Sequence, residues 1–535
     1  MYIFIFIYLV YIFYKSRTSL YMLQQNLYNE NDRYLRWIKR SIDRCFNPID
    51  FLPFFLSIFI FITDESFIME VIYWSISLIY VKGILDEYKK NLLNQNKIKF
   101  NVTSRIKRLY ITEFSIIGIL IVFLIMTNFS GLLLVLVSLT IALTYYYIYL
   151  VNLINKPIEK MVYYYYFNKA KTKLREMTRL KVVGITGSYG KTSSKNILAH
   201  ILSCKYITRP TPKNLNTPYG LMITINNYLD KFDEVLIAEM GAYVPLEIKN
   251  MCDFVHPKYG ILTVIGEAHL ETFKTKENIC RAKFELIESL DPNGACVLNR
   301  DDLYQVNYVN HELKNKVKII WIGINNKEAD FNASNIKSDK NGMSFEFTYQ
   351  EKSYKVETKL LGVHNVYNIL ASIALGVEMK VPIDLMIQRI ISIQPVEHRL
   401  EIKKVNNITM IDDAYNSNPI GAQNALDVLK MMDGIKVVVT PGMIELGDKE
   451  KELNREFGKK IGDVADYVIL IGENRCKEIK KGILESGFNN DKIKVLNRVV
   501  DAYKVLEELK GKNMESDVYA LFENDLPDIY SEGVK

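Results

Sequence analysis

Five long apolar runs in the first 155 residues constrain the fold of this chain more than any other feature of its sequence. A membrane-spanning helix needs about 20 consecutive apolar residues. The last run reaches that length alone, and the fourth reaches it together with the flank Tyr110–Glu113. The runs predict an α-helical membrane domain over residues 1–155 with about five spans: Met1–Tyr14, Phe51–Thr63, Phe67–Val81, Phe114–Thr127 and Gly131–Ile154.

The second and third runs are separated only by Asp64, Glu65 and Ser66, so they form either two spans joined by a tight turn or a re-entrant hairpin. Lysines and arginines follow the first, third and fifth runs, whereas residues 64–66 and 128–130 contain none. Because basic loops stay on the cytoplasmic side, five spans place the N-terminus outside and the C-terminal part in the cytoplasm. The first run lacks the basic start and the cleavage site of a signal peptide.

Composition excludes several classes of protein. The 535 residues carry 68 Lys+Arg against 61 Asp+Glu, and this net charge of +7 is too small and too dispersed for a nucleic-acid-binding surface. The six cysteines lie far apart and form no C-x-x-C pair, which argues against a zinc ribbon and a disulfide scaffold and favours a reducing compartment.

A phosphate-binding loop is predicted after Leu180, where short β-branched runs begin to alternate with helical segments. The strand Lys181–Ile185 leads into T-G-S-Y-G-K-T, and an amphipathic helix follows. In such a loop, backbone N–H groups and the helix N-terminus face phosphates, Lys191 bridges them and Thr192 can ligate Mg²⁺. The strict pattern has a glycine where this chain has Ile185, so the loop is a variant, and a chance Gly-rich turn is the alternative.

Two further predicted strands end in polar side chains that suit magnesium and ATP. Val235–Ala238 ends at Glu239, and Gly260–Ile265 ends shortly before His269. Ligands of open parallel sheets bind beyond the carboxyl ends of the strands. Taken singly, Glu239 and His269 are more often an ordinary loop acid and a hydrogen-bonded loop histidine, but their joint position beside a phosphate loop favours a nucleotide site.

Nine short motifs, all in one order, resemble the Mur ligase family. They are G-I-T-G-S-Y-G-K-T from Gly184, N-L-N-T-P-Y-G from Asn214, A-E-M-G-A from Ala238, V-I-G-E-A-H-L-E from Val264, R-A-K-F-E from Arg281, G-V-H-N-V-Y-N from Gly362, E-H-R from Glu397, I-D-D-A-Y-N-S-N-P from Ile411 and M-I-E-L-G from Met443. Mur ligases phosphorylate a substrate carboxylate with ATP and let an amine attack the acyl phosphate. The resemblance is closest to members that add D-alanyl-D-alanine to UDP-N-acetylmuramoyl-tripeptide, and it implies the same peptidoglycan-precursor substrates here.

The resemblance also implies roles for the residues around the phosphates. Lys191 holds the β- and γ-phosphates within a loop that includes Gly187, Ser188 and Gly190. Thr192 and Glu239 hold one Mg²⁺, and His269 ligates a second. Lys283 of R-A-K-F-E is often N-carbamoylated in the family, which creates a further anionic metal ligand; a plain surface lysine of a helix is the alternative.

The remaining implied roles concern the nucleotide and the last domain. Asn365 and Asn368 contact the nucleotide, with helix capping as the alternative reading. Arg399 reaches the ATP phosphates, Asp413 anchors the ribose, and Tyr415 and Asn416 belong to the same wall. The catalytic set is therefore expected to be Lys191, His269, Lys283 and Arg399.

The predicted architecture is a helical membrane domain followed by two α/β domains. Residues 170–393 form the central ATP-binding domain with a parallel sheet, and residues 394–535 a Rossmann-like domain. Strands are expected at Ile435–Val439, Tyr467–Ile471 and Val518–Phe522, and Ser344–Tyr349 suggests a small β-rich insertion. The family's usual first domain is soluble and binds uridine diphosphate, and residues 1–155 do not resemble it. The uridine diphosphate is therefore held differently, or the acceptor is a lipid-linked precursor.

Two other classes of function compete with this one. Folylpolyglutamate, cyanophycin and precursor-amidating ligases share the fold, but the second has an additional ATP-grasp half and the third a four-cysteine zinc site, and this sequence contains neither. A non-enzymatic ATP-gated scaffold or transporter has no need of Lys283, His269, Arg399 and Asp413 together. The predicted spans also carry few charges, which disfavours a transport pathway.

Overall fold

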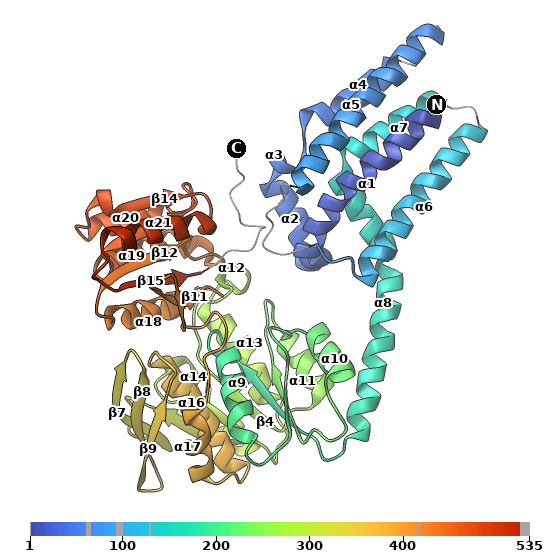
Figure 1. The fold of residues 1–535 in the computed structure, drawn as a ribbon. Helices are drawn as coiled ribbons and strands as arrows, with labels where there is room; N and C mark the ends of the chain where they lie inside the picture. The colour runs from blue at the N-terminus through green and yellow to red at the C-terminus, as the bar shows by residue number, and fades with distance from the viewer. Residues whose placement is uncertain (1, 60–65, 93–99, 128–129, 416, 525–535) are drawn as a thin grey trace. The chain divides into compact units, whose positions relative to one another are not determined.

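The computed structural model describes residues 2–59, 66–92, 100–127, 130–415 and 417–524, and the chain forms two compact units that divide between Tyr165 and Tyr166 (Figure 1). The first unit is helical. Its elements are α1 (Tyr2–Gln25), η1 (Leu27–Asp32), α2 (Arg33–Arg40), α3 (Ile42–Cys45), α4 (Pro48–Ile58), α5 (Ser66–Leu92), α6 (Ser104–Met126), α7 (Ser130–Ala142) and α8 (Thr144–Glu176).

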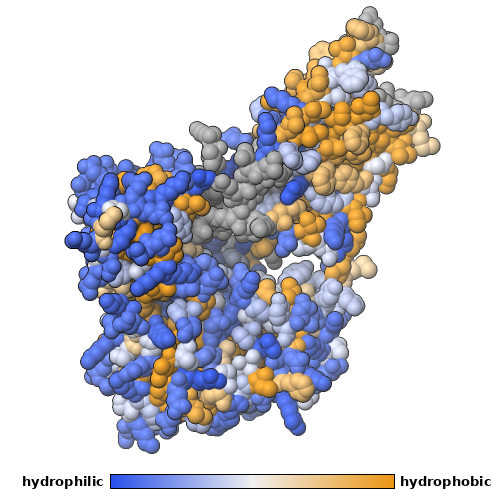
Figure 2. All heavy atoms as spheres, in the orientation of Figure 1, coloured by the Kyte–Doolittle hydropathy of each residue, from blue (hydrophilic) through white to orange (hydrophobic). Residues whose placement is uncertain are grey.

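Three described helices of the first unit are long and apolar enough to cross a membrane: Tyr2–Gln25, Phe67–Lys89 and Ser104–Met126. Apolar side chains cover much of the visible surface of these helices, whereas the visible face of the second unit is mostly hydrophilic (Figure 2). Helix α4 is apolar but only 11 residues long, and part of the expected run Phe51–Thr63 lies outside the described residues.

The last expected run is not one straight span. Residues 131–142 and helix α8 meet at a bend of 93°, so they make a broken span or a re-entrant element. At the bend, the Thr144 hydroxyl donates to the carbonyl oxygens of Thr140 and Ile141, at 3.0 and 2.8 Å. A hydropathy pattern does not register such a bend. Helix α8 also continues past residue 155 without interruption.

Two buried charged side chains inside the first unit form an ion pair. Lys15 of α1 is 2.5 Å from Asp50 of α4, and the Tyr11 hydroxyl donates to the same carboxylate at 2.6 Å. Lys15 and Asp50 are both buried, so leaving either charge unpaired would cost several kcal/mol by the usual ~3–5 kcal/mol scale for buried pairs. The pair therefore holds α1 and α4 together.

The second unit begins with a nine-stranded sheet in the order β2-β3-β1-β4-β5-β6-β7-β8-β9. The strands from β2 to β7 pair in parallel, and β7, β8 and β9 form an antiparallel meander at one edge. The expected strand Ser344–Tyr349 lies in β8 of this meander. The strands are β1 (Lys181–Thr186), β2 (Thr208–Pro210), β3 (Val235–Glu239), β4 (Tyr259–Leu262), β5 (Ala295–Asn299), β6 (Lys318–Gly323), β7 (Phe331–Asp339), β8 (Gly342–Tyr349) and β9 (Lys352–Thr358).

Helices cover both faces of this sheet. Successive side chains of β1 point to opposite faces, and most of them are buried, so both faces must be covered. Val183 and Ile185 belong to the core that also contains side chains of α9 and α16. Gly184 points the other way, and a Cβ atom there would lie 2.4 Å from Leu286 of α13, so close helix packing requires the glycine. The helices are α9 (Lys191–Leu202), α10 (Pro218–Asn227), α11 (Glu247–Val255), α12 (Leu270–Phe273), α13 (Lys276–Glu288), α14 (Leu303–Tyr308), α15 (His311–Lys316), α16 (His364–Glu378) and α17 (Ile383–Ile391).

A six-stranded sheet in the order β10-β11-β15-β12-β13-β14 forms the C-terminal domain, with only β10 antiparallel. The three strands expected here coincide with β12, β13 and β15. The elements are β10 (Glu401–Val405), β11 (Ile408–Asp413), α18 (Pro419–Lys430), β12 (Ile435–Thr440), η3 (Gly447–Lys449), α19 (Glu450–Gly462), β13 (Tyr467–Ile471), α20 (Lys477–Glu485), η4 (Asn490–Lys492), β14 (Ile493–Leu496), α21 (Val499–Lys512) and β15 (Val518–Glu523).

Candidate active site

The predicted phosphate loop joins β1 to α9, and its backbone conformation depends on two glycines. Gly187 has φ +142°, and a Cβ atom there would lie 2.0 Å from the Thr263 hydroxyl oxygen. Gly190 precedes α9 with φ +78° in the left-handed region. The Ser188 hydroxyl donates to the Gly266 carbonyl oxygen, which ties the loop to the segment after β4. The loop therefore presents the N-terminus of α9, where anions bind.

Lys191, the first residue of α9, lies over this loop. Its ammonium group donates to the carbonyl oxygens of Gly187 and Ser188, at 2.7 and 3.0 Å. Burial lowers the pKa of Lys191 to about 8, while the charge of Glu239 acts in the opposite direction. Phosphate groups would favour the charged form, because an opposite charge nearby raises the pKa of a lysine.

Glu239, at the end of β3, is held by three side chains. Its Oε1 accepts hydrogen bonds from the Thr192 hydroxyl at 3.2 Å and from Asn216 Nδ2 at 3.1 Å. Its Oε2 lies 2.9 Å from the ammonium of Lys195, which is 1 % exposed. Lys195 stands one helical turn after Lys191, so the i,i+4 spacing in K-T-S-S-K offered a signal that sequence reasoning missed.

His269 and Lys283 lie in the same cavity as Glu239. This cavity has a volume of about 160 Å³ and lies against the phosphate loop. The residues that line it include Lys191, Thr192, Glu239, His269, Lys283 and Arg399. The expected catalytic residues and the expected metal ligands thus converge at one place. Gly187 does not line the cavity; it shapes the loop beneath it.

His269 is hydrogen-bonded across two domains. Its Nδ1 lies 2.7 Å from the Glu445 carboxylate of the C-terminal domain, and the ring centroids of His269 and Tyr243 are 4.2 Å apart. Burial lowers the pKa of His269, although the bond to Glu445 opposes the shift. The two interpretations of His269 are therefore compatible, because its imidazole is hydrogen-bonded to Glu445 and also lines the cavity.

Lys283 is not a surface lysine. It is 2 % exposed on α13, and the hydrogen bond described for its ammonium is a long one of 3.5 Å to the Ala242 carbonyl oxygen. Burial, together with the nearby charge of Lys191, lowers the pKa of Lys283 to about 7. A substantial fraction of neutral amine is therefore present near neutral pH.

The donor set can hold magnesium together with a nucleotide. Among the described residues, no group of three or more His, Cys, Asp and Glu side chains forms a closed metal site. Mg²⁺ suits such an open set, because it is usually bound by one or two carboxylates with water and substrate phosphates. Thr192 and Glu239 supply a hydroxyl and a carboxylate 3.2 Å apart, and His269 supplies an imidazole at the same cavity.

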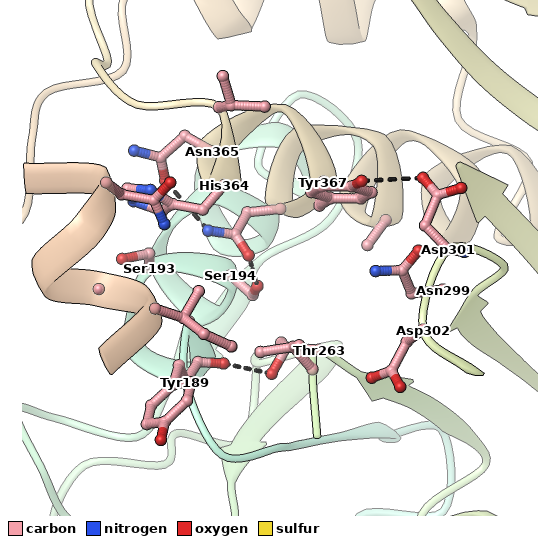
Figure 3. A pocket seen from close by; sticks show the side chains of 18 of the residues that line it. Tyr189, Ser193, Ser194, Thr263, Asn299, Asp301, Asp302, His364, Asn365 and Tyr367 are labelled. Carbon is pink, nitrogen blue, oxygen red and sulfur yellow. Dashed lines mark hydrogen bonds between the residues drawn. The ribbon is translucent and has the colours of Figure 1, made fainter. Parts of the chain in front are cut away.

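A larger cavity of about 560 Å³ adjoins the phosphate loop at Gly190 (Figure 3). Arg399 lines this cavity as well as the smaller one. Asn365, Asn368 and Asp413 line it, as expected for a nucleotide pocket. Asn368 Nδ2 donates to Asn365 Oδ1 at 3.1 Å, and the Ser194 hydroxyl donates to Asn368 Oδ1 at 2.9 Å. Neither asparagine caps α16, whose N-cap is Val363 without a side-chain bond. Asn368 instead connects α16 to α9, and Asn365 bonds to Asn368 within α16.

Arg399 and Asp413 come from the C-terminal domain. The Arg399 guanidinium lies 4.3 Å from the centroid of the Tyr415 ring, and Arg399 lines both cavities. Its neighbours His398 and Leu400 have φ of +59° and +49°, and His398 Nδ1 is 2.8 Å from Asp412. Tyr415 lines the smaller cavity, and Asn416, expected in the same wall, lies outside the described residues.

Several residues of the larger cavity were not predicted as site residues. His364 is half-buried, and its Nδ1 atom is buried without a hydrogen-bond partner among the described residues. Across the cavity, the Tyr367 hydroxyl donates to Asp301 at 2.8 Å (Figure 3). Asp301 lies just after β5, and ligands of parallel sheets bind at the carboxyl ends of the strands. Its position in the sequence was therefore a signal that could have identified it. His364 stood within the quoted motif G-V-H-N-V-Y-N.

Comparison with known proteins agrees with this geometry. Models of the Mur ligase middle domain and of the Mur ligase glutamate ligase domain match residues 185–376 and 398–518. A UDP-N-acetylmuramoyl-tripeptide--D-alanyl-D-alanine ligase of Buchnera aphidicola subsp. Baizongia pistaciae is 31% identical over 339 residues, which cover 61% of this chain and 72% of that protein. The chain belongs to the Mur ligase family. The Mur ligase of the same name from Escherichia coli is 30% identical over 309 residues, which cover 57% of this chain and 68% of that protein.

Solved structures of Mur ligases resemble a large part of this chain. MurF from Acinetobacter baumannii gives a TM-score of 0.61 at 26% identity, covering 67% of this chain and 77% of that one. MurF ligase from Thermotoga maritima in complex with ADP gives 0.60 at 27% identity, covering 69% and 81%. This Mur ligase is therefore an ATP-dependent ligase of the kind that builds peptidoglycan precursors.

Two neighbouring carboxyl groups, those of the partly buried Asp413 and the buried Glu523, support the nucleotide pocket of this Mur ligase. Asp413 and Glu523 are register partners at the carboxyl ends of the parallel strands β11 and β15. The Ser417 hydroxyl donates to Glu523 at 2.6 Å. Burial raises the pKa of Asp413 to about 6, and burial with the charge of Asp413 raises the pKa of Glu523 well above its ordinary value. At neutral pH the folded pair therefore retains a proton.

We expect Glu523→Gln to weaken the pH dependence of stability. The folded wild type binds a proton at Glu523 that the unfolded chain releases above pH 4.5, so the free energy of unfolding falls with rising pH, by about 1.4 kcal/mol per pH unit for one proton. The glutamine amide has no proton to release in this range, so the variant does not lose stability in this way as the pH rises. Its free energy of unfolding therefore increases relative to that of wild type between pH 5 and 7.5. Thermal unfolding in detergent at both pH values measures the difference. The exposed Glu515→Gln is the control; equal pH slopes for wild type and Glu523→Gln would contradict the assignment.

Proposed function

We propose that this Mur ligase joins D-alanyl-D-alanine to the tripeptide of UDP-N-acetylmuramoyl-tripeptide through an acyl phosphate. The observation that carries the proposal is the meeting of two adjoining cavities at Gly190 and Arg399, one with Lys191, Glu239 and Lys283 and the other suited to a nucleotide. The names of the similar proteins from Buchnera aphidicola and Escherichia coli supply the substrates.

In the first step, the substrate carboxylate attacks the γ-phosphorus of ATP and ADP leaves. The Lys191 ammonium and the Arg399 guanidinium stand at the cavity where the charge of the transferred phosphoryl group develops. Fixed charges in a site with little water stabilise that charge at no reorganisation cost. In the second step, the amine of the dipeptide attacks the acyl carbon, phosphate leaves with the electrons of the C–O bond and the nitrogen loses a proton, which forms the amide bond.

Asn365 and Asn368 are proposed to contact the nucleotide, and Asp413 to anchor its ribose. All three line the larger cavity. Arg399 and Asp413 belong to the C-terminal domain, whereas the phosphate loop belongs to the central domain. Productive ATP binding therefore requires the two domains to be closed on each other.

Magnesium is proposed to be held by Thr192, Glu239 and His269, and it supplies positive charge to the phosphates. Lys283 is proposed to carry an N-carbamate. Its neutral amine attacks CO₂, a C–N bond forms and a proton is released, so a buried cation becomes a carboxylate-like anion. The lowered pKa of Lys283 supports this reaction, because only the unprotonated amine has a lone pair.

The first 165 residues are proposed to embed the enzyme in the bacterial cell membrane, with the catalytic domains in the cytoplasm. Three helices of membrane-spanning length and the apolar surface in Figure 2 support this location. Such an anchor also favours a second candidate, in which the acceptor is a lipid-linked precursor presented at the bilayer.

Phosphate release by the purified full-length protein in detergent tests the proposal. UDP-N-acetylmuramoyl-tripeptide and D-alanyl-D-alanine are supplied singly and together with ATP and Mg²⁺. Release that requires both substrates supports the proposed function. No release with this pair, but release with a lipid-linked muropeptide and the same dipeptide, would replace it with the second candidate.

A further inference from the structure

We infer that the M-I-E-L-G loop of the C-terminal domain, residues 443–447, is a latch whose Glu445 orients His269 as a magnesium ligand only when the two domains are closed. The inference rests on the proposed function, in which His269 is a metal ligand. The loop was singled out by its motif, but neither ATP binding nor the phosphoryl-transfer step uses it. In this role Glu445 is a positioning residue, because Glu445 acts on the metal only through His269.

The contact between the loop and the central domain has two parts. The Glu445 carboxylate is 2.7 Å from His269 Nδ1, and the Glu271 backbone N–H donates to the Glu445 carbonyl oxygen at 3.4 Å. Gly447, with φ +61°, packs against the backbone of Glu271, since a Cβ atom added there would be 3.5 Å from its Cα. Side chain and backbone thus hold the same short segment of the central domain.

The loop is rigid on the side of the C-terminal domain. Met443 and Leu446 are 1 % and 2 % exposed and belong to its core. Asn454 of α19 accepts a hydrogen bond from the Met443 backbone N–H and donates one to its carbonyl oxygen, at 2.9 and 3.0 Å. Glu445 therefore moves with the whole domain and not as an independent side chain.

The bond determines which nitrogen of His269 is available to a cation. A carboxylate only accepts hydrogen bonds, so Nδ1 carries the proton and Nε2 keeps its lone pair. A carboxylate behind a metal-ligating histidine fixes the ring and increases its basicity. Because Glu445 belongs to one domain and His269 to the other, opening the domains removes this support at the same time as it withdraws Arg399 from the phosphates.

Metal binding by the full-length protein in detergent tests the latch. Mn²⁺ affinity is measured by electron paramagnetic resonance with a non-hydrolysable ATP analogue present. We expect Glu445→Ala to weaken the Mn²⁺ site that depends on His269 by about 10- to 100-fold, the usual cost of removing an outer partner of a metal ligand. Glu445→Gln, whose amide oxygen still accepts a hydrogen bond, is expected to lose less. Metal-free nucleotide affinity should not change.

Two controls make the result specific. Glu452→Ala removes an exposed carboxylate of α19 in the same domain and should leave Mn²⁺ affinity at the wild-type value. His269→Ala should cause the loss by itself, and adding Glu445→Ala to it should cause no more, because residues that act through one contact are not additive. Equal affinities for Glu445→Ala and Glu452→Ala, or losses that multiply in the double variant, would overturn the latch.

The outcome is separable from that of the proposed function. If no ligation occurs with the proposed substrates but Mn²⁺ affinity falls as expected, the latch stands and the substrate assignment fails. If ligation requires both substrates and Glu445→Ala binds Mn²⁺ like wild type, the assignment stands and the latch fails. Similar thermal unfolding of Glu445→Gln and wild type shows that the comparison is made between folded proteins.

Discussion

Lys191→Ala is expected to lower substrate-dependent phosphate release by at least about 10²-fold, the usual loss when one preorganised donor to a developing charge is removed. Lys191 is the cation at the start of α9, and Arg399 also lines the cavity. The loss should appear mainly in kcat, because the charge it stabilises develops in the transition state. Steady-state phosphate release at saturating ATP measures it.

A matched lysine controls for general effects of removing a positive charge. Lys340→Ala removes an exposed lysine between β7 and β8, and it should leave phosphate release unchanged. Both variants should unfold at a temperature close to that of wild type. Full activity in folded Lys191→Ala would exclude the phosphate loop from the reaction and with it the proposed mechanism.

Lys283→Ala is expected to lower the same activity by roughly 10²-fold, on the scale of losing one preorganised electrostatic group, and to abolish a carbamate signal. With ¹³C-labelled bicarbonate, wild-type protein should show a carbamate carbon resonance that the variant lacks. The resonance should fade as pH falls below about 7, because the pKa of Lys283 lies there and the protonated amine cannot attack CO₂. Small carboxylates such as acetate should restore part of the activity of Lys283→Ala.

The control for this prediction lies on the same helix. Arg281→Ala removes an exposed cation two residues away on α13 and should retain both the resonance and the activity. Wild-type activity that is independent of bicarbonate, together with full activity of Lys283→Ala, would mean that the buried lysine serves only to pack α13 against the sheet.

Prediction from the sequence was most successful where structure is local. The strand, loop and helix around Lys191 follow each other without interruption, so hydrophobic periodicity and two glycines were sufficient to place them. The rule for parallel strands then placed Glu239 beside the loop, since the carboxyl ends of β1 and β3 are register neighbours. The run at residues 131–154 forms two helical segments that meet at a bend of 93°, a feature that hydropathy does not include.

Motif order alone carried the expectation that His269, Lys283 and Arg399 belong to one site, and the structure places all three at one cavity. Their physical state was not predictable. The lowered pKa of Lys283 depends on how completely surrounding helices and strands exclude water from its ammonium group. A sequence names the titratable group but not the dielectric environment that sets its protonation.

By itself, then, the sequence determined the local elements: the apolar helices of the first unit, the phosphate loop and the strands whose ends carry polar groups, because each depends on residues a few positions apart. Only the tertiary structure decided the contacts between distant segments. Glu445 meets His269 from 176 residues away, and Glu523 lies beside Asp413 because their two strands are neighbours in a sheet. Such pairings arise from the packing of whole domains, which no local pattern encodes.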